Sequence, residues 1–333
     1  MRGHRLRRGP RMALLGLLAL VLSGAGVLAL ANAGALHVPS RLSPLVSDDG
    51  EGRAGPASSK PRVEKARHPI GVPRPRPRNA NSDRGLPAKD GCFVNDGESR
   101  PQSSCVYGKR NSDTTVVLFG DSKALHYFPA LEPVARKRGW RLLVLVKAGC
   151  PPMAIVKRGE PGETTECERW REAAFDRIGS AKGRRLVITS GNVDYQGIKS
   201  HGRTLAGEAR DAAVRASYAA ALERLRRLGT RVAVIKDNPV PPRDIPSCVS
   251  RSLDRLGRCA FHAPAGFQRG IEERAAAAVE GAGLIDVTDA VCSARRCPAV
   301  IDGVLVYRNT AHFTATFART LAPVVGRQLP RIG

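Results

Sequence analysis

Residues 115–123 read TVVLFGDSK, an apolar run that ends in Gly-Asp-Ser-Lys. The run predicts a buried β-strand, and residues 124–138 after it predict a helix. Ser122 would then lie on a tight strand-to-helix turn, with its hydroxyl and backbone N–H facing one space at the positive end of the helix. A nucleophilic serine needs that placement. An inert turn would also suit these residues, because Asp and Ser are common helix N-caps.

Strand-like and helix-like segments alternate along the rest of the chain. Further apolar strands are predicted at 141–146, 186–190, 231–236 and 284–287, helices at 168–178, 207–228, 266–280 and 314–328, and a hairpin at 300–307. Thr314 is expected to cap the last helix. Continuous apolar strands that alternate with helices indicate a parallel sheet covered on both faces. Active sites of such sheets lie beyond the carboxyl ends of the strands, where Ser122 is expected.

Three more blocks of polar or turn-forming residues follow apolar runs. They read KAGCPP at 147–152, TSGN at 189–192 and YRNTAHFT at 307–314. Since each block follows an apolar run, we expect all of them to meet the Gly-Asp-Ser-Lys block at one rim of the sheet.

The N-terminal residues 1–33 predict a signal anchor or a signal peptide. Five arginines precede an apolar run at 12–31 that is long enough to cross a bilayer. The basic flank places the N-terminus in the cytoplasm and exports everything after the run. Its length favours a single-pass membrane helix, with the domain outside the cytoplasm. The alternative is cleavage after Ala33, at an A-x-A site, and secretion.

Residues 34–90 predict a disordered linker. Prolines recur throughout this segment, and residues 73–78 read PRPRPR, which favours an extended, stiff and positive chain. Too little apolar surface is present to form a core. The globular domain is therefore expected to span 91–333.

The eight cysteines predict disulfides, because an even number in an exported chain favours them. Eight cysteines allow 105 pairings, so the sequence alone leaves the connectivity open. A zinc site is the rival interpretation, but no C-x-x-C pair has the usual ligand spacing. The sequence calls for no metal and no organic cofactor. Pairing of sequence neighbours would give Cys92–Cys105, Cys150–Cys167, Cys248–Cys259 and Cys292–Cys297.

The net charge of +24 has two explanations. Outside the cell, basic residues can meet anionic wall polymers or lipid headgroups, or they can simply form solvated arginine surfaces. Nucleic acid is disfavoured as a partner by export and by an aromatic content of 5%, which is low for a base-stacking surface.

Residues 90–330 resemble the SGNH hydrolase family, and more closely the SGNH domain of O-antigen-acetylase-type membrane acyltransferases of actinobacteria. Besides the Gly-Asp-Ser-Lys block, the resemblance rests on Gly-Cys-Pro-Pro at 149–152, Cys-x-x-Trp-Arg at 167–171 and Leu-Val-Tyr-Arg…His-Phe-Thr at 305–314. It implies an α/β fold, three-layer α/β/α and flavodoxin-like, with a parallel five-stranded sheet.

The resemblance also implies roles for individual residues. Ser122 would be the nucleophile and His312 its general base. The oxyanion hole would consist of the Ser122 N–H, Gly149 and Asn192, and such donors contribute of order 10²–10³ in rate each. Each residue has a structural alternative: turns for Gly149 and Asn192, and the surface beside a helix for His312. Asp121 would support the nucleophile.

The chain departs from the family pattern at two positions. The family has Asp three residues before the base, where this chain has Asn309, and an amide in that place costs one serine protease about 10⁴ in kcat. Three outcomes are open. A Ser–His dyad, with the ring oriented by a backbone carbonyl, could suffice for catalysis. Asp302 or Asp289 could replace the missing carboxylate, or the domain could have lost most of its activity. Relatives commonly carry His after the nucleophile, where this chain has Lys123, whose role is open.

These observations predict an extracytoplasmic, membrane-tethered serine esterase or O-acyltransferase that acts on acyl esters of cell-envelope glycans. Full-length relatives carry many membrane spans, so this chain would hydrolyse its substrate, use an extracellular acyl donor or work with a separate multi-pass acyltransferase partner. The alternative is a catalytically impaired binding module for anionic cell-wall polymers, which Asn309 and Lys123 favour.

Overall fold

The computed structural model describes residues 71–95, 97–154, 165–195, 198–200, 203–264, 267, 269–293 and 296–332. The expected membrane helix or signal peptide and the first part of the expected linker, residues 34–70, lie outside these ranges. Within them, no helix combines the length and the apolar character that a membrane span needs.

The central sheet is mostly parallel and has the strand order β1-β4-β3-β5-β8-β10. Its strands are β1 (Phe93–Val94), β2 (Val106–Gly108), β3 (Thr114–Gly120), β4 (Arg141–Lys147), β5 (Arg184–Ser190), β8 (Arg231–Ile235) and β10 (Ala282–Ile285). The predicted parallel five-stranded sheet is therefore present as β4-β3-β5-β8-β10. It is extended at the β4 edge by the parallel β1 and by β2, which is antiparallel to β4.

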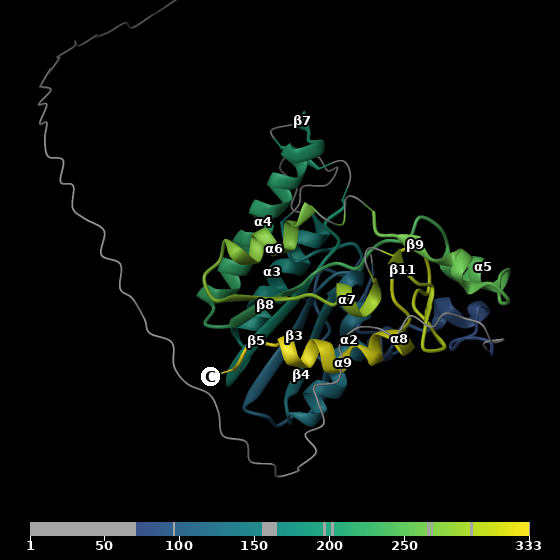
Figure 1. Cartoon of the computed structure of the whole chain (residues 1–333). Coiled ribbons are helices and arrows are strands. Elements are labelled where there is room, and N and C mark those ends of the chain that lie inside the picture. The colour runs from purple at the N-terminus through teal and green to yellow at the C-terminus, as the bar shows by residue number, and fades with distance from the viewer. Residues whose placement is uncertain are drawn as a thin grey trace, which may run out of the picture. The chain divides into compact units, whose positions relative to one another are not determined.

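Helices cover both faces of this sheet (Figure 1). Val116 and Leu118 of β3 pack on one face, with the helices α2, α8 and α9, whereas Val117 and Phe119 pack on the other face, with α3, α4 and α6. Burial on both faces explains why the strand sequences are continuously apolar. The helices are α2 (Ser122–Lys137), α3 (Glu166–Gly179), α4 (Gly207–Arg227), α6 (Ile271–Ala277), α8 (Ala315–Thr320) and α9 (Ala322–Gln328).

Two predicted helices differ from what the sequence suggested. Helix α6 begins at Ile271 and ends at Ala277, rather than spanning 266–280. The single closing helix expected at the C-terminus is divided into α8 and α9, which meet at Leu321. Pro323 follows directly, and it lacks the N–H that a continuous helix would need there.

The Pro/Arg-rich residues 73–90 are folded against the domain, which corrects the expectation of an unfolded linker in this part. The Arg74 N–H donates to Gly303 O (2.9 Å), and Arg74 O accepts from Leu305 N (2.8 Å), so the segment lies beside a hairpin strand. Ala80 is fully buried. The elements involved are the 3₁₀ helix η1 (Pro77–Ser82), α1 (Leu86–Lys89) and the predicted hairpin of β12 (Val300–Ile301) and β13 (Val304–Leu305).

Asp83 in this segment caps helix α8. Its backbone carbonyl accepts from Ala315 N (2.9 Å) and its carboxylate from Thr316 N (2.9 Å), while Thr314, as predicted, caps the same helix by accepting from Phe317 N (3.0 Å). We expect Asp83→Ala to lower the free energy of unfolding by about 1 kcal/mol, because one helix N–H loses its acceptor.

Urea unfolding measures the effect of Asp83→Ala. Asp83→Asn serves as its control, since the amide oxygen can still accept the bond. Equal stability of the wild type and the alanine variant would show that the Asp83 carboxylate contributes nothing to α8.

Gly120 ends β3 where the backbone comes too close to β5 for any side chain. A Cβ atom at this position would lie 1.9 Å from Ser190 O, and the φ angle of Gly120 is +153°. The strand register pairs Gly120 with both Val146 and Ser190. The residues that follow these three positions therefore lie together at the carboxyl edge of the sheet.

All eight cysteines are paired as sequence neighbours, so no thiolate is left for the rival zinc site. This finding settles the connectivity that the sequence left open, and it confirms the disulfide role expected of every cysteine. The four bonds are Cys92–Cys105, Cys150–Cys167, Cys248–Cys259 and Cys292–Cys297.

Each disulfide joins elements that lie close together in the chain. Cys92 directly precedes β1 and Cys105 directly precedes β2, so their bond ties together the two strands that extend the sheet at the β4 edge. The bond between Cys248 and Cys259 joins α5 (Ile245–Ser250) to η2 (Leu256–Cys259). Cys292, which directly follows α7 (Thr288–Val291), is bonded to Cys297 of β11 (Arg296–Cys297).

Two further short pairings complete the described elements. Strand β11 pairs with β9 (Phe261–His262), and β6 (Lys199–Ser200) pairs with β7 (Arg203–Thr204), both antiparallel.

Candidate active site

Ser122 is the first residue of α2, and the imidazole of His312 lies directly against it. The distance between His312 Nε2 and Ser122 Oγ is 2.9 Å, across a sequence separation of 190 residues. His312 belongs to a tight turn closed by a bridge between Tyr307 and Phe313, in which the Arg308 N–H donates to His312 O (2.9 Å). The fold thus places a hydroxyl and a base in hydrogen-bond contact.

Asn309 fixes the orientation of this base. Its Oδ1 lies 3.1 Å from His312 Nδ1 and also accepts two backbone N–H groups of the same turn, at 3.0 Å each. An amide nitrogen cannot accept those bonds, so the oxygen must face the ring, and Nδ1 must carry the proton. Nε2 is then free to accept the Ser122 proton. Neither Asp302 nor Asp289 hydrogen-bonds His312, so neither replaces the missing carboxylate.

The surroundings of His312 are strongly cationic. Burial, followed by the charges of Arg308, Lys123 and Arg84, lowers the pKa of His312 to about 3. The imidazole is therefore neutral at pH 7 and available as a base. The same charges oppose the imidazolium that forms when it takes up a proton.

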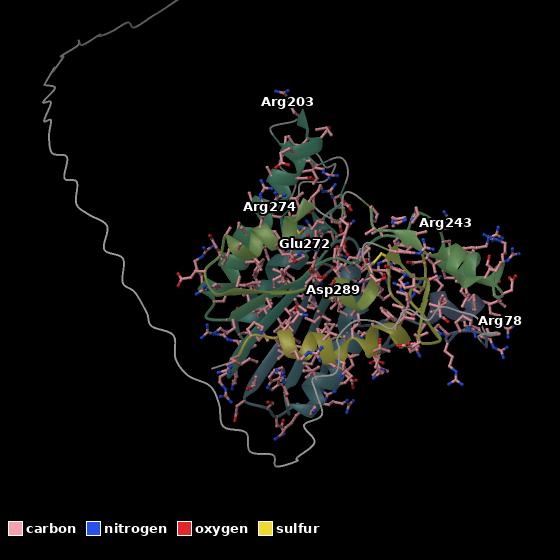
Figure 2. All side chains as sticks on the ribbon, in the orientation of Figure 1. Arg78, Arg203, Arg243, Glu272, Arg274 and Asp289 are labelled. Atoms are coloured by element: carbon pink, nitrogen blue, oxygen red, sulfur yellow. A yellow bond between two sulfur atoms is a disulfide. The ribbon has the colours of Figure 1, made fainter. Side chains whose placement is uncertain are left out.

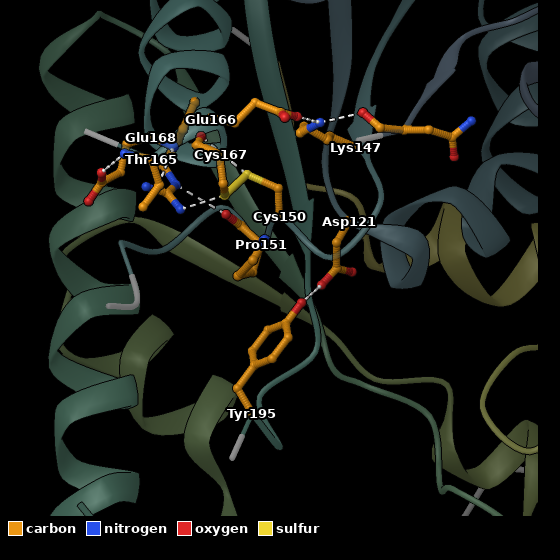
Figure 3. Close-up of a disulfide and its surroundings, with 11 residues drawn as sticks. Asp121, Lys147, Cys150, Pro151, Thr165, Glu166, Cys167, Glu168 and Tyr195 are labelled. Atoms are coloured by element: carbon orange, nitrogen blue, oxygen red, sulfur yellow. Dashed lines mark hydrogen bonds and ion pairs between the residues drawn. A yellow bond between two sulfur atoms is a disulfide. The ribbon is translucent and has the colours of Figure 1, made fainter. Parts of the chain in front are cut away.

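Asp121 connects the nucleophile to a neighbouring loop. Its side chain is only 1% exposed, and its Oδ1 accepts from Lys123 N (2.8 Å). Its Oδ2 accepts from Asn192 N (3.0 Å) and from the Tyr195 hydroxyl (2.8 Å), the bond that Figure 3 shows. Burial raises the pKa of Asp121, and these three donors oppose that rise. Sequence reasoning missed Tyr195, because nothing in its neighbourhood marks it as a partner of a residue 74 positions away.

We expect Tyr195→Phe to lower the free energy of unfolding by about 1.5 kcal/mol, because a buried carboxylate loses one of its donors. Tyr107→Phe is a matched control: the Tyr107 hydroxyl donates to Asp90 at a more exposed position, where the same deletion should cost less. Urea unfolding of both variants checks the difference. Equal losses would contradict a special role for the buried bond.

The three expected oxyanion donors lie at the same edge of the sheet. The Ser122 N–H is the first of α2 and has no acceptor within the helix. Asn192 Oδ1 accepts from Asp194 N (2.9 Å), which leaves Nδ2 as the donor of that amide. Gly149 follows β4 in the left-handed conformation, with a φ of +60°. The oxyanion role of these groups stays a prediction.

The turn that contains Gly149 is held by several contacts (Figure 3). The Cys150–Cys167 disulfide joins it to the first turn of α3, and Arg171 Nε donates to Pro151 O at 3.2 Å. Lys147, at the end of β4, pairs with a glutamate of the same helix. These contacts connect the turn to α3, so its backbone is preorganised.

Lys123 is buried beneath the site and has three partners. Its Nζ lies 2.8 Å from Asp237 Oδ1, and it donates to Asn238 Oδ1 and Ala311 O at 3.0 Å each. Ala311 directly precedes the base His312, so Lys123 ties α2 to the turn that carries this base. Sequence reasoning missed Asp237 and Asn238. They follow β8 closely, so the principle that active sites lie beyond the carboxyl ends of parallel strands could have identified them.

Comparison with known proteins places this site in a family. Residues 91–327 match the family model described as "SGNH domain (fused to AT3 domains)". The periplasmic domain of a lipopolysaccharide acetyltransferase from Salmonella ser. Paratyphi A has a similar fold, with a TM-score of 0.51 at 13% identity over 72% of this chain and 91% of that one.

A carbohydrate esterase family 2 enzyme with a carbohydrate binding domain, from Corynascus thermopiles, gives a TM-score of 0.37 at 13% identity over 64% of each chain. No curated protein matches this chain. Because the family model covers most of the sequence and includes both Ser122 and His312, the chain belongs to the SGNH domain family.

Proposed function

We propose that this protein is an extracytoplasmic serine esterase or O-acyltransferase that acts on acyl esters, acetyl esters above all, of cell-envelope glycans. The observation that carries the proposal is the 2.9 Å contact between Ser122 Oγ and His312 Nε2. Asn309 supports it, because the oxygen facing the ring selects the tautomer in which Nε2 can accept a proton.

In the proposed mechanism, Ser122 Oγ attacks the acyl carbonyl while His312 Nε2 takes its proton. The oxyanion is held by the Ser122 N–H and Asn192 Nδ2, with Gly149 as the third donor that the family resemblance implies. The intermediate collapses when His312 returns the proton to the leaving alcohol. Water or a sugar hydroxyl then attacks the acyl-serine while His312 takes its proton. The bond between the acyl carbon and Ser122 Oγ breaks, His312 returns the proton to Oγ, and the acyl group leaves as the free acid or as a new sugar ester.

The proposed location outside the cytoplasm is supported by the four disulfides, which are rare in reducing compartments. We further propose that residues 12–31 anchor the chain in the membrane and that a separate multi-pass acyltransferase supplies the acyl donor if the reaction is transfer. N-terminal sequencing of the mature protein tests the anchor, because a start at Gly34 would reveal a cleaved signal peptide.

A fluorophosphonate probe tests the proposed nucleophile. The full chain in detergent should be labelled on the peptide that contains Ser122, and it should hydrolyse a chromogenic acetyl ester. Ser122→Ala should abolish both reactions, and His312→Ala should suppress them. Ser180→Ala is the matched control, since this exposed serine ends α3 away from the site. Labelling elsewhere, or turnover equal in the wild type and Ser122→Ala, would contradict the proposal.

The alternative is a binding module for anionic wall polymers. It is favoured by the missing negative charge at position 309, because an amide orients His312 but does not stabilise its imidazolium. It predicts no labelling of Ser122 and no turnover, together with retention of the protein on an anionic polymer. The same experiment therefore separates the two functions.

A further inference from the structure

Arg308 is a buried cation whose side chain has no partner among the described residues. The residue is 6% exposed, and no hydrogen bond or ion pair links its guanidinium to any residue that the structure describes. Burial, followed by the charge of Arg84, lowers the pKa of Arg308 to about 10, so it remains charged at pH 7. A buried charge that lacks a counter-ion is costly, and proteins pair such groups or use them to bind ligands.

The neighbours of Arg308 add positive charge. Arg84, whose Nε donates to a backbone carbonyl of the preceding 3₁₀ helix, is the charge that acts most strongly on it. The carboxylate of Asp83 opposes these cations, but it forms no ion pair with Arg308 and accepts from Thr316 N.

Arg308 also lies beside the base. Its backbone N–H is bonded to His312 O, and it is the residue before Asn309, which contacts the ring of His312. Among the charged groups around His312, Arg308 lowers the pKa of its imidazole most. The turn that carries the base therefore also places the Arg308 cation close to the reacting centre.

We propose that Arg308, assisted by Arg84, binds an anionic group, a carboxylate or a phosphate, that the substrate carries close to the scissile ester. This inference rests on the proposed function and specifies its substrate class. The planar fork of a guanidinium binds both anions through two hydrogen bonds. A bound anion would offset the charges that oppose the His312 imidazolium. The substrate would then supply the negative charge that Asn309 lacks.

Two chromogenic esters test the proposal: 5-acetoxy-2-nitrobenzoate, which carries a carboxylate, and its neutral methyl ester. The full chain is used, and the readout is the ratio of kcat/KM for the anionic ester to that for the neutral one. Intrinsic reactivity cancels when this ratio is compared between variants. We expect Arg308→Gln to lower the ratio about tenfold or more.

The control is Arg243→Gln, at an exposed arginine at the surface (Figure 2), which should leave the ratio unchanged. Competition by inorganic phosphate and by benzoate shows which anion the site prefers. An equal ratio in the wild type and Arg308→Gln would overturn the proposal.

A binding measurement separates this inference from the proposed function. In the Ser122→Ala protein, inorganic phosphate should raise Tm by about 2–4 °C over chloride of equal ionic strength, and the rise should vanish when Arg308→Gln is added. Turnover of both esters without this shift, and with an unchanged ratio, would refute the anion site and leave the esterase standing. The opposite result is also informative. If phosphate raises Tm through Arg308 but the wild type neither hydrolyses esters nor reacts with the fluorophosphonate, the esterase is refuted and the anion site is kept.

Discussion

The Lys123→Met variant should lose about 3–5 kcal/mol of unfolding free energy at pH 7. The side chains of Lys123 and Asp237 are 4% and 7% exposed, with 2.8 Å between Nζ and Oδ1. Methionine fills the space of the lysine stem but leaves the buried carboxylate of Asp237 without its cation. The hydrogen bond to Ala311 O is lost as well, so the turn that carries His312 should loosen and catalysis should fall.

The loss in Lys123→Met should depend on pH. Burial already raises the pKa of Asp237 above its ordinary value, and Lys123 opposes that rise. Without Lys123 the pKa of Asp237 rises further, so its carboxyl group is protonated and harmless at low pH. The destabilisation then appears as the pH increases from the unfolded pKa to the folded one.

Urea unfolding at pH 4 and pH 7 measures this dependence, and the loss should be larger at pH 7. Adding Asp237→Asn to Lys123→Met should restore part of the stability, because the unpaired charge is removed. Lys137→Met, at an exposed lysine of the same helix, should change stability by less than about 0.5 kcal/mol. The same loss at both pH values would rule out an ionic role for Lys123.

Asn309→Asp should raise kcat/KM for an acetyl ester by about 10- to 100-fold at neutral pH, equivalent to about 1.4–2.7 kcal/mol. A carboxylate can accept the same three hydrogen bonds as Asn309 Oδ1 and adds a negative charge beside His312. The gain comes from that charge, since the wild type already has the productive tautomer. The gain in rate should therefore be smaller than the loss in kcat, about 10⁴-fold, of the serine protease in which the amide also selects the wrong tautomer.

The pH profile of kcat/KM checks the cause of this gain. With a His312 pKa of about 3, the wild type should keep its activity until the pH falls close to that value. The added carboxylate raises the pKa of His312, so Asn309→Asp should lose activity at a higher pH than the wild type. Asn309→Ala, which removes the acceptor of Nδ1, should lower kcat instead. An unchanged acidic limb in Asn309→Asp would disprove the electrostatic explanation.

The sheet could be predicted from the sequence because its strands are buried on both faces. Continuous apolar runs such as 115–119 and 186–190 are typical of strands that helices cover on both faces of a sheet. The fold of residues 73–90 could not be predicted, for a related reason. Their prolines and arginines suggest an unfolded chain, whereas their partner is the backbone of a hairpin more than 200 residues away. Composition carries no information about such a partner.

The site was predictable only where a motif marks it. The family blocks identified Ser122 and His312, and the departure at Asn309 was visible as well. The orientation of its amide was not, because this depends on two backbone N–H groups of the folded turn. Arg308 lies inside a quoted block, but the sequence shows neither its burial nor that no described residue forms an ion pair with it.

The folded segment before residue 91 affects how recombinant fragments of this protein should be designed. A fragment cut at the start of the family match, residue 91, would lack Asp83, Arg84 and the buried Ala80. Helix α8 would lose two acceptors for its N-terminal N–H groups. His312 would lose one of the nearby cations, Arg84, that lower its pKa. A fragment that begins at residue 71 keeps them all, so substrate preferences measured on the two fragments should differ.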